Sequence, residues 1–310
     1  MNKGKKLSIP LPKDLDFGEC CWYLDRGYDD CMHVLQGDTL LKAERLGGLE
    51  LLFSIRSEGG VLQVEVLHGG TGGRIPELLG EYIRTWFDLG RDLGPFYDLL
   101  KKDKRLAYME TAYRGLRLVG IVDLFETLSW SIIGQQINLK FAYTLKRRMV
   151  EKYGAGILHE GKVYHLFPTC ETLAAATVED LRALQFSRSK AEYLIGLANS
   201  FAKGVMSREQ LVALPDTESR LKALTGLRGI GVWTANYTLM KSLRDPGCIP
   251  HGDTGLLTAL ANHGIIKERS ETGRITRYFS KYKGWESYLV FYLWRSLSVR
   301  PEGKTSPAAG

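Results

Sequence analysis

The sequence has no apolar run that approaches the roughly 18 residues needed to cross a bilayer. Its first residues, MNKGKKLSIPLPKD, are basic, but no apolar stretch follows them. A signal peptide or membrane anchor needs such a stretch, so neither is expected. These absences predict a protein with no membrane partner that acts in the cytoplasm.

Cysteine and histidine are also sparse. The five cysteines form no C-x-x-C pair, and no two of the six histidines are four residues apart. These spacings argue against a structural zinc site, a four-cysteine iron–sulfur cluster and a helical metal pair. The sequence predicts reduced, buried thiols.

Positive charge is in excess, with a formal net charge of +7 and an isoelectric point near 9.0. This excess permits an anionic partner such as nucleic acid but does not require one. Basic residues cluster at 101–105 and 145–152. Each cluster fits either a binding patch or a solvated helix face.

The pattern of apolar residues divides the chain into two parts. Alternation in LQVEVL and a hairpin loop at 57–60 predict at least four short antiparallel strands before residue 68. From about Ile75 the apolar period becomes helical, and nearly all the rest is predicted helix. We predict an α+β protein whose parts are a β-rich domain (1–105), a helical domain (106–300) and a disordered tail (301–310).

Several helix starts are marked by side chains that can accept hydrogen bonds from the free amides of a first turn. Thr177, Ser207 and Asp216 each precede a helical pattern, and Thr177 is followed three residues later by an aspartate. These are the residue types preferred at helix N-caps. They predict separate short helices across residues 177–225.

Three glycines lie in LTGLRGIGVWTANYTLM (224–240), between two helical patterns. Glycine permits positive φ and close approach of another backbone. A turn built from Gly226, Gly229 and Gly231 would leave amides free at the start of the next helix, where a phosphate can bind. A glycine-rich turn without a ligand would have the same pattern.

Asp253 follows this turn and directly precedes another apolar-periodic helix. On its own it is a good N-cap, worth ~1 kcal/mol. Together, the L-x-G-I-G turn and the later P-x-x-D resemble helix-hairpin-helix DNA glycosylases, and most closely their 3-methyladenine DNA glycosylase II type. Three further segments, 125–154, 167–184 and 282–294, match that family's motifs in order. The resemblance implies a TBP-like antiparallel N-terminal domain followed by an all-α glycosylase domain.

The resemblance also implies a mechanism. Asp253 would stabilise the sugar cation that forms when a flipped-out base leaves. Bifunctional relatives carry a Schiff-base lysine where this chain has Trp233. The resemblance therefore implies a monofunctional enzyme of base excision repair that excises alkylated bases from double-stranded DNA and leaves an abasic site. A bifunctional oxidised-base glycosylase/lyase and a non-catalytic DNA-binding protein are the alternatives.

Alkylated purines carry positive charge, which favours an aromatic pocket. The family's pocket positions correspond to Trp233, Tyr237 and Trp294, with Trp22 as the counterpart from the N-terminal domain. Core packing is the alternative for each of these rings. Stacking does not rank 3-methyladenine, 7-methylguanine, hypoxanthine and 8-oxoguanine as substrates.

The remaining expectations concern DNA. Gln136, in the GQQIN loop, corresponds to the residue that fills the emptied base stack. The resemblance also implies phosphate contacts around the hairpin and a Na⁺ or K⁺ ion held by its main-chain carbonyls. A monomer associated with the nucleoid is the simplest expectation. The predicted contacts are Gln136, Arg228, Gly229, Gly231 and Thr234, and the predicted cation ligands are Thr225, Leu227 and Ile230.

Overall fold

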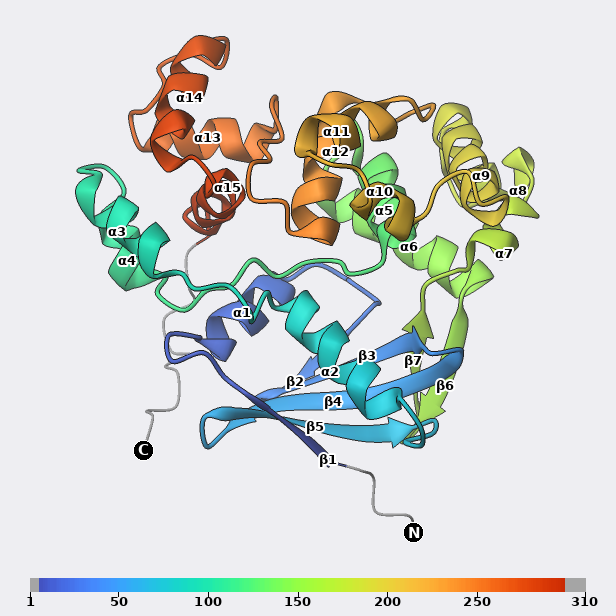
Figure 1. Ribbon diagram of the computed structural model, residues 1–310. Coiled ribbons are helices and arrows are strands. Elements are labelled where there is room, and N and C mark those ends of the chain that lie inside the picture. Colours follow the sequence, from blue (N-terminus) through green and yellow to red (C-terminus); the bar gives the residue numbers. More distant parts are fainter. Residues whose placement is uncertain (1–5, 299–310) are drawn as a thin grey trace.

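The computed structural model describes residues 6–298, which form an antiparallel sheet beneath a larger group of helices (Figure 1). The sheet has the strand order β1-β5-β4-β3-β2, with every neighbouring pair antiparallel. The four strands predicted before residue 68 are confirmed, and β1 adds a fifth that the sequence does not predict. The strands are β1 (Lys6–Pro10), β2 (Val34–Gln36), β3 (Thr39–Leu46), β4 (Leu49–Glu58) and β5 (Val61–His68).

The β4–β5 hairpin turns on two glycines. Gly59 and Gly60 have φ of 60° and 75°. Positive φ at both central residues is typical of the type I′ turn, whose twist matches that of the flanking strands. Strand pairing continues to Glu58 and Val61, so the turn is shorter than the predicted loop at 57–60.

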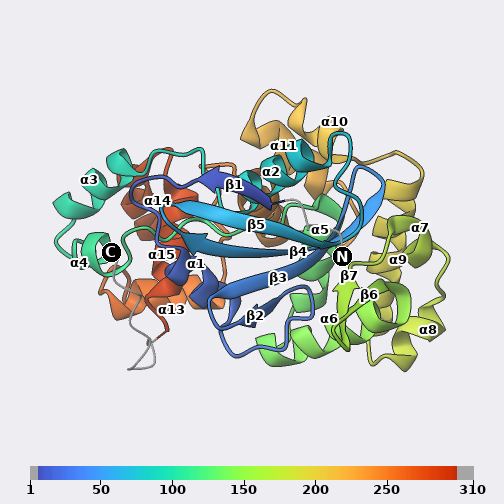
Figure 2. The same ribbon diagram turned by 90° about the horizontal axis from the view of Figure 1, so that it is seen from below.

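Alternate side chains of the sheet enter two different cores, as the two-residue period of a strand requires. On one face Phe53 packs against α2 (Ile75–Trp86), with its ring centroid 6.1 Å from that of Tyr82. On the other face Leu52 and Ala43 belong to a small separate cluster. Figure 2 shows the strands of this sheet side by side from below.

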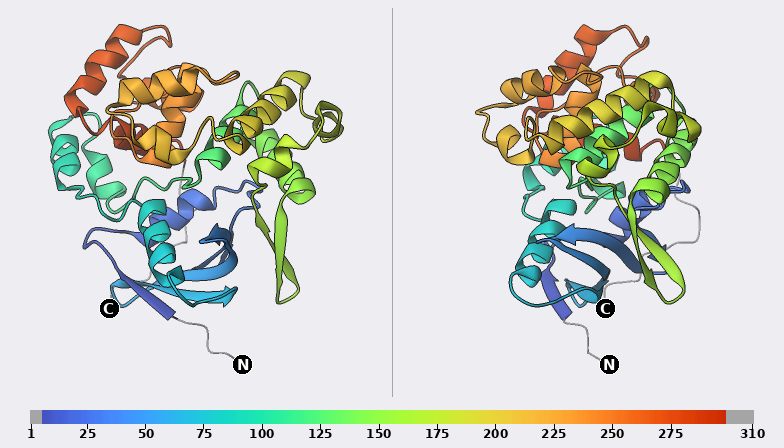
Figure 3. Two further views of the ribbon diagram at one scale, coloured as in Figure 1. Left: turned by 45° about the vertical axis from the view of Figure 1, so that its right-hand side comes forward. Right: turned by 90° about the vertical axis from the view of Figure 1, so that its right-hand side faces the viewer.

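A second hairpin completes that small cluster. Strands β6 (Ala155–His159) and β7 (Lys162–Leu166) pair with each other and bring Ile157 and Tyr164 against β3 and β4. Figure 3 shows the hairpin extending alongside the sheet. The prediction of an all-α domain after the first 105 residues is wrong here. Alternating residues around a Glu160–Gly161 turn, both with positive φ, are the sequence signal for this hairpin.

Helices make up most of the remaining chain, and the α+β class is confirmed. The predicted N-caps are present: Thr177 forms a reciprocal capping box with Asp180, and Ser207 and Asp216 each accept from the amide three residues on. The helices before residue 154 are α1 (Phe17–Leu24), α2, α3 (Gly94–Lys102), α4 (Tyr108–Ala112), α5 (Leu124–Gly134) and α6 (Leu139–Tyr153). Those after it are α7 (Cys170–Ala174), α8 (Val178–Ala183), α9 (Arg188–Ala202), α10 (Arg208–Val212), α11 (Thr217–Thr225), α12 (Val232–Thr238), η1 (Leu239–Leu243), α13 (Thr254–Asn262), α14 (Thr272–Phe279), η2 (Ser280–Tyr282) and α15 (Glu286–Arg295).

One large core runs through both parts of the chain. A buried ion pair links them, with Arg295 Nε of α15 lying 2.8 Å from a carboxylate oxygen of Glu19 in α1. The predicted boundary at residue 105 falls between α3 and α4, which pack on each other. The boundary stays a prediction, and the tail at 301–310 lies outside the described residues.

The expectations about membrane-spanning segments and about the cysteines can be compared with the structure of residues 6–298. None of their helices is long and apolar enough to cross a membrane. All five cysteines are free, and four are buried. Cys170 is the exception to the predicted burial, because it lies at the start of α7 and is only partly covered.

Candidate active site

Helices α11 and α12 form a tight hairpin, as predicted. At Gly229 φ is 88°, and a Cβ atom there would lie 2.5 Å from the ring of Tyr193 in α9. Both the backbone angle and the available space therefore require glycine at this position. Gly231 is the extended N-cap of α12, and Gly226 caps α11 with a right-handed φ of −70°.

The loop between α5 and α6 is fastened to this hairpin by Gln135, a residue that sequence reasoning did not single out. Its Nε2 donates to the Gly229 carbonyl at 2.9 Å and to Thr234 Oγ1 at 3.2 Å. The next residue, Gln136, is exposed and has a left-handed φ of 56°. The loop therefore presents Gln136 to solvent beside the hairpin.

Asp253 is held at the N-terminus of α13. Its Oδ1 accepts from the Leu256 amide at 2.7 Å, so the side chain caps the helix. The same oxygen accepts from Trp294 Nε1 at 2.8 Å, and Oδ2 accepts from Trp233 Nε1 at 3.3 Å. Capping and a place at the cleft are therefore compatible, because three N–H groups from three segments fix one carboxylate.

The indoles that hold Asp253 belong to a row of aromatic rings. Trp233 and Tyr237, one turn apart on α12, stack with centroids 5.4 Å apart and planes 19° apart. Trp294 of α15 lies 6.2 Å beyond Tyr237. Trp130 Nε1 donates to the Tyr237 hydroxyl at 3.1 Å. These rings line the helical side of a cleft of about 1000 Å³, and the N-terminal part of the chain contributes Tyr23, Arg26 and Tyr28 to its lining, here called the N-terminal side.

A buried lysine joins the two sides of the cleft. Lys146 of α6 lies 3.1 Å from Glu126 of α5 and 3.3 Å from Asp30, in the segment after α1. Burial alone would raise the pKa of Asp30, but Lys146 and His33 outweigh it and lower that pKa. The pKa of Lys146 is raised, because the two carboxylates outweigh its burial.

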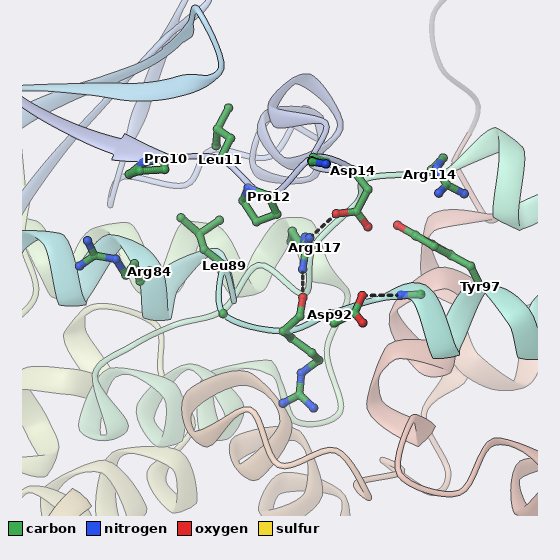
Figure 4. A pocket seen from close by; sticks show the side chains of 14 residues that line it. Pro10, Leu11, Pro12, Asp14, Arg84, Leu89, Asp92, Tyr97, Arg114 and Arg117 are labelled. Atoms are coloured by element: carbon green, nitrogen blue, oxygen red, sulfur yellow. Dashed lines mark hydrogen bonds and ion pairs between the residues drawn. The ribbon is translucent and has the colours of Figure 1, made fainter.

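A second cavity, of about 690 Å³, lies under the β1–α1 connection (Figure 4). Arginines surround it, but protein groups already hold several of them. Buried Arg117 donates to Asp14 at 2.7 Å and to the Arg91 carbonyl, and Asp92 accepts from the Gly94 amide. These contacts join the N-terminal segment to the linker before α5, so we assign this cavity no chemistry.

The residues that carry the hairpin and Asp253 also decide the family. The family described as HhH-GPD superfamily base excision DNA repair protein matches residues 129–283. The chain belongs to the HhH-GPD superfamily. The DNA-3-methyladenine glycosylase of Bacillus subtilis is 37% identical to this HhH-GPD protein over 292 residues, which cover 93% of this chain and 96% of that one.

Two solved structures share the fold of this HhH-GPD protein. The 3-methyladenine DNA glycosylase from Archaeoglobus fulgidus matches with a TM-score of 0.80 at 23% identity, covering 93% of this chain and 97% of that chain. The 8-oxoguanine glycosylase/lyase of Clostridium acetobutylicum, in complex with double-stranded DNA, matches with a TM-score of 0.72 at 19% identity, covering 96% and 100%. Both likenesses confirm the α+β fold class, and the fold alone does not separate the two activities.

Of two further predicted site residues of the HhH-GPD protein, Trp22 lies outside the cleft lining and Thr234 belongs to it. Trp22 is absent from the cleft lining, and the Arg295 guanidinium lies 3.9 Å from its ring centroid. Successive helical residues point roughly 100° apart, so Tyr23, not Trp22, lines the cleft. Thr234 is only 2% exposed, and its hydroxyl accepts from Gln135. Its side chain therefore positions the α5–α6 loop, and its predicted contact with DNA stays a prediction.

The other predicted hairpin residues are in place, with their roles untested. The Arg228 side chain is 78% exposed and lies 3.1 Å from Glu192. For the cation, the Leu227 carbonyl accepts from the Ile230 amide at 3.1 Å, which curls the turn. A carbonyl oxygen has a second lone pair, so a ligand set with Thr225 is compatible with this turn. Within residues 6–298 no three His, Cys, Asp or Glu side chains form a metal cluster.

Proposed function

We propose that the protein is a monofunctional DNA glycosylase that hydrolytically excises alkylated bases, 3-methyladenine among them, from double-stranded DNA. The observation that carries the proposal is the position of Asp253, whose carboxylate two indole N–H groups hold at an aromatic cleft. The relative from Bacillus subtilis is named for 3-methyladenine release.

The proposed reaction begins with a nucleotide turned out of the duplex into the cleft. As the bond between C1′ and the base nitrogen breaks, positive charge develops on the sugar, and the Asp253 carboxylate stabilises it. Water adds to C1′, and the proton that it loses ends on the released base. The fixed N–H groups around Asp253 hold the carboxylate in place, so little reorganisation is needed at the transition state.

The proposed reaction has no strand-cleaving step, because Trp233 stands where bifunctional relatives carry a Schiff-base lysine. The indole nitrogen is no nucleophile, so the covalent sugar adduct of a lyase cannot form there. Among the cleft lysines, Lys42 and Lys146 are paired with acids. Cleavage at those amines is therefore disfavoured.

The second candidate function is a bifunctional glycosylase/lyase that uses Lys241 as its nucleophile. Burial, with Arg244 nearby, lowers the pKa of Lys241 well below its usual value. However, its Nζ lies 3.0 Å from the Tyr23 hydroxyl, donates to the Val119 carbonyl and is covered by protein. Borohydride treatment during turnover should trap no covalent protein–DNA adduct, and an adduct lost in Lys241→Met would establish the lyase.

The central test is Asp253→Asn. Asparagine is as good an N-cap as aspartate, so α13 should stay capped while the negative charge is lost. Release of 3-methyladenine from methylated duplex DNA should fall ~100-fold to 1000-fold, the range found when one group that stabilises transition-state charge is removed. Binding to the same DNA should change little.

Asp216→Asn is the matched control. Asp216 caps α11 by the same contact, accepting from the Ser219 amide at 2.7 Å, but it lies outside the cleft. This variant should release bases at the wild-type rate. Near-wild-type release by Asp253→Asn would refute the assigned role, and wild-type protein that binds but never releases a base would support the non-catalytic alternative.

The remaining expectations are part of the same proposal. We place the protein's action on chromosomal DNA in the nucleoid, as a monomer, with Na⁺ or K⁺ bound by the hairpin carbonyls. Size-exclusion chromatography coupled to light scattering, with and without duplex, tests the monomer. DNA affinity in matched Na⁺, K⁺ and tetramethylammonium buffers tests the cation, since the last ion is too large for a carbonyl site.

A further inference from the structure

Arg26 is a half-buried cation in the cleft that no carboxylate neutralises. It follows α1 in the chain and lines the cleft. Its guanidinium carbon lies 4.2 Å from the Tyr23 ring centroid and 5.8 Å from that of Tyr28. Across the described part of the chain it forms no ion pair or hydrogen bond. A guanidinium has five N–H donors and no acceptor, so those donors are available to a ligand.

The Tyr237 hydroxyl is a second free donor in the same cleft, contributed by α12. It accepts a hydrogen bond from Trp130 Nε1, which is a donor only. The hydroxyl's own proton meets no acceptor among residues 6–298. Burial raises the pKa of Tyr237 well above its usual value, so the proton stays on the oxygen. A buried donor without an acceptor costs free energy that a bound ligand can recover.

The carboxylates of Asp30, Glu126 and Asp253 in the cleft, by contrast, are already paired. The Asp253 carboxylate receives three N–H groups, and Lys146 takes the carboxylates of Asp30 and Glu126. The cleft therefore offers a ligand unpaired donors and positive charge. The complementary base has acceptor atoms at its edge and no charge of its own.

We propose that Arg26 and Tyr237 are specificity-determining residues that bind the acceptor edge of neutral oxopurines and assist their departure. This inference rests on the proposed glycosylase function. Hypoxanthine, with lone pairs on O6 and N7, is the simplest such base. In 7-methylguanine the N7 lone pair carries the methyl group, and the base is already a cation, so Arg26 repels it.

The two kinds of base also differ in what they need in order to leave. When C1′–N9 breaks, the bonding electron pair goes to the base; water adds to C1′, and the proton from that water ends on the released base. A cationic base becomes neutral as it takes the electron pair. A neutral base becomes anionic until it is protonated, so donors at O6 and N7 stabilise its transition state more than its ground state.

Arg26→Met tests the proposal, because methionine keeps the length and apolar stem without the donors. The full-length protein is given two duplexes of the same sequence, one with a single hypoxanthine and one with a single 7-methylguanine, under single-turnover conditions. The ratio of the hypoxanthine rate to the 7-methylguanine rate should fall ~10-fold to 100-fold, as expected for hydrogen bonds from a charged donor. Tyr237→Phe, which keeps the ring, should lower the same ratio by a smaller factor.

Arg56→Met is the matched control, because Arg56 is an exposed residue of β4 outside the cleft. It removes the same charge and should leave the ratio unchanged. Thermal unfolding checks that each variant is folded, and Tyr237→Phe alone carries the test if Arg26→Met does not fold.

Three results would overturn the inference. The first is an unchanged ratio in both cleft variants. The second is an equal loss for both lesions with weaker binding of undamaged duplex, which would make Arg26 a phosphate contact. The third is a wild-type protein that releases 7-methylguanine but no hypoxanthine. Wild-type protein that releases neither base would instead overturn the proposed function.

Discussion

The two sides of the cleft differ in how their polar groups are satisfied. On the helical side, Asp253 and the indole N–H groups of Trp233 and Trp294 are bonded to one another. On the N-terminal side, Arg26 contacts the rings of Tyr23 and Tyr28 and forms no ion pair or hydrogen bond within residues 6–298. A group that must be in place for every substrate is fixed by its neighbours, whereas a group that distinguishes substrates has its bonding capacity free.

The difference also suggests a division of labour between the two parts of the chain. On the helical side, Trp233, Tyr237 and Asp253 fall within the family match at 129–283, whereas Trp294 and the N-terminal side lie outside it. Apart from changes to the Tyr237 hydroxyl, substitutions on the helical side should lower the rate for every base by a similar factor. Substitutions on the N-terminal side should change the relative rates at which different bases are released. The predictions below test this division, from the largest expected effect to the smallest.

Lys146→Met should break the connection between the two sides. The substitution leaves Glu126 and Asp30 without their shared cation, at side-chain exposures of 7% and 17%. Loss of one partner from a buried ion pair costs about 3–5 kcal/mol, so we expect a loss of unfolding free energy near the lower limit, because Asp30 keeps some solvent. Urea denaturation at pH 7 measures this loss.

The pH dependence of that loss identifies its cause. The folded pKa of Asp30 is lowered, so its contribution is present above the usual Asp pKa of about 4 and is lost as pH falls through the folded pKa. The gap between wild type and Lys146→Met should therefore narrow below pH ~4. Arg147→Met removes the neighbouring exposed pair with Asp29 and should cost at most ~1 kcal/mol. Equal losses for both variants would contradict the buried-pair explanation.

Trp294→Phe tests the helical side. Phenylalanine keeps a ring beside Tyr237 but removes the N–H that donates to Asp253. A charged hydrogen bond is worth roughly 1.5–3 kcal/mol, so release should slow ~10-fold to 100-fold, by similar factors for hypoxanthine and 7-methylguanine. Single-turnover rates on both duplexes measure this.

Trp285→Phe is the matched control for that variant. Trp285 stacks on Phe96, with centroids 5.7 Å apart, and lies outside the cleft. Its substitution should leave both rates at wild-type values. If Trp294→Phe changed the two lesions by very different factors, the division between a general side and a selective side would fail.

Sequence reasoning found the helical side better than the N-terminal side, for a physical reason. Trp233, Tyr237 and Asp253 lie within 21 residues of each other, on a hairpin and a helix cap whose local signals are strong. Gln135 acts through a partner far along the chain, Gly229, and Arg26 lines the cleft only because the fold brings the segment after α1 to it. No local pattern encodes such a contact. The cleft lining includes Tyr23 and not the predicted Trp22 for the same reason, since choosing between them requires the orientation of α1 in the fold.

Gly229→Ala should weaken DNA binding without changing base preference. An alanine there meets the Tyr193 ring at 2.5 Å and must adopt a φ of 88°. A left-handed non-glycine residue costs roughly 1–2 kcal/mol, which should distort the turn and lower affinity for any duplex up to ~10-fold. Gly226→Ala is the control, because its φ is −70° and its new Cβ makes only ordinary contacts. Fluorescence anisotropy measures both, and equal affinities for the two variants would contradict the assigned role of Gly229.

Arg228→Met should have the smallest effect, and the salt dependence of binding detects it. The side chain is 78% exposed and pairs with Glu192, so its loss should cost at most ~1 kcal/mol of stability. If the guanidinium leaves Glu192 for a phosphate, the slope of log K against log salt should become shallower by about one unit, equally for damaged and undamaged duplexes. Arg274→Met, which breaks an exposed pair on α14, should leave the slope unchanged. An unchanged slope in Arg228→Met would mean that the hairpin meets DNA through its backbone. A slope change confined to lesion DNA would mean that Arg228, on the helical side, contributes to base selectivity.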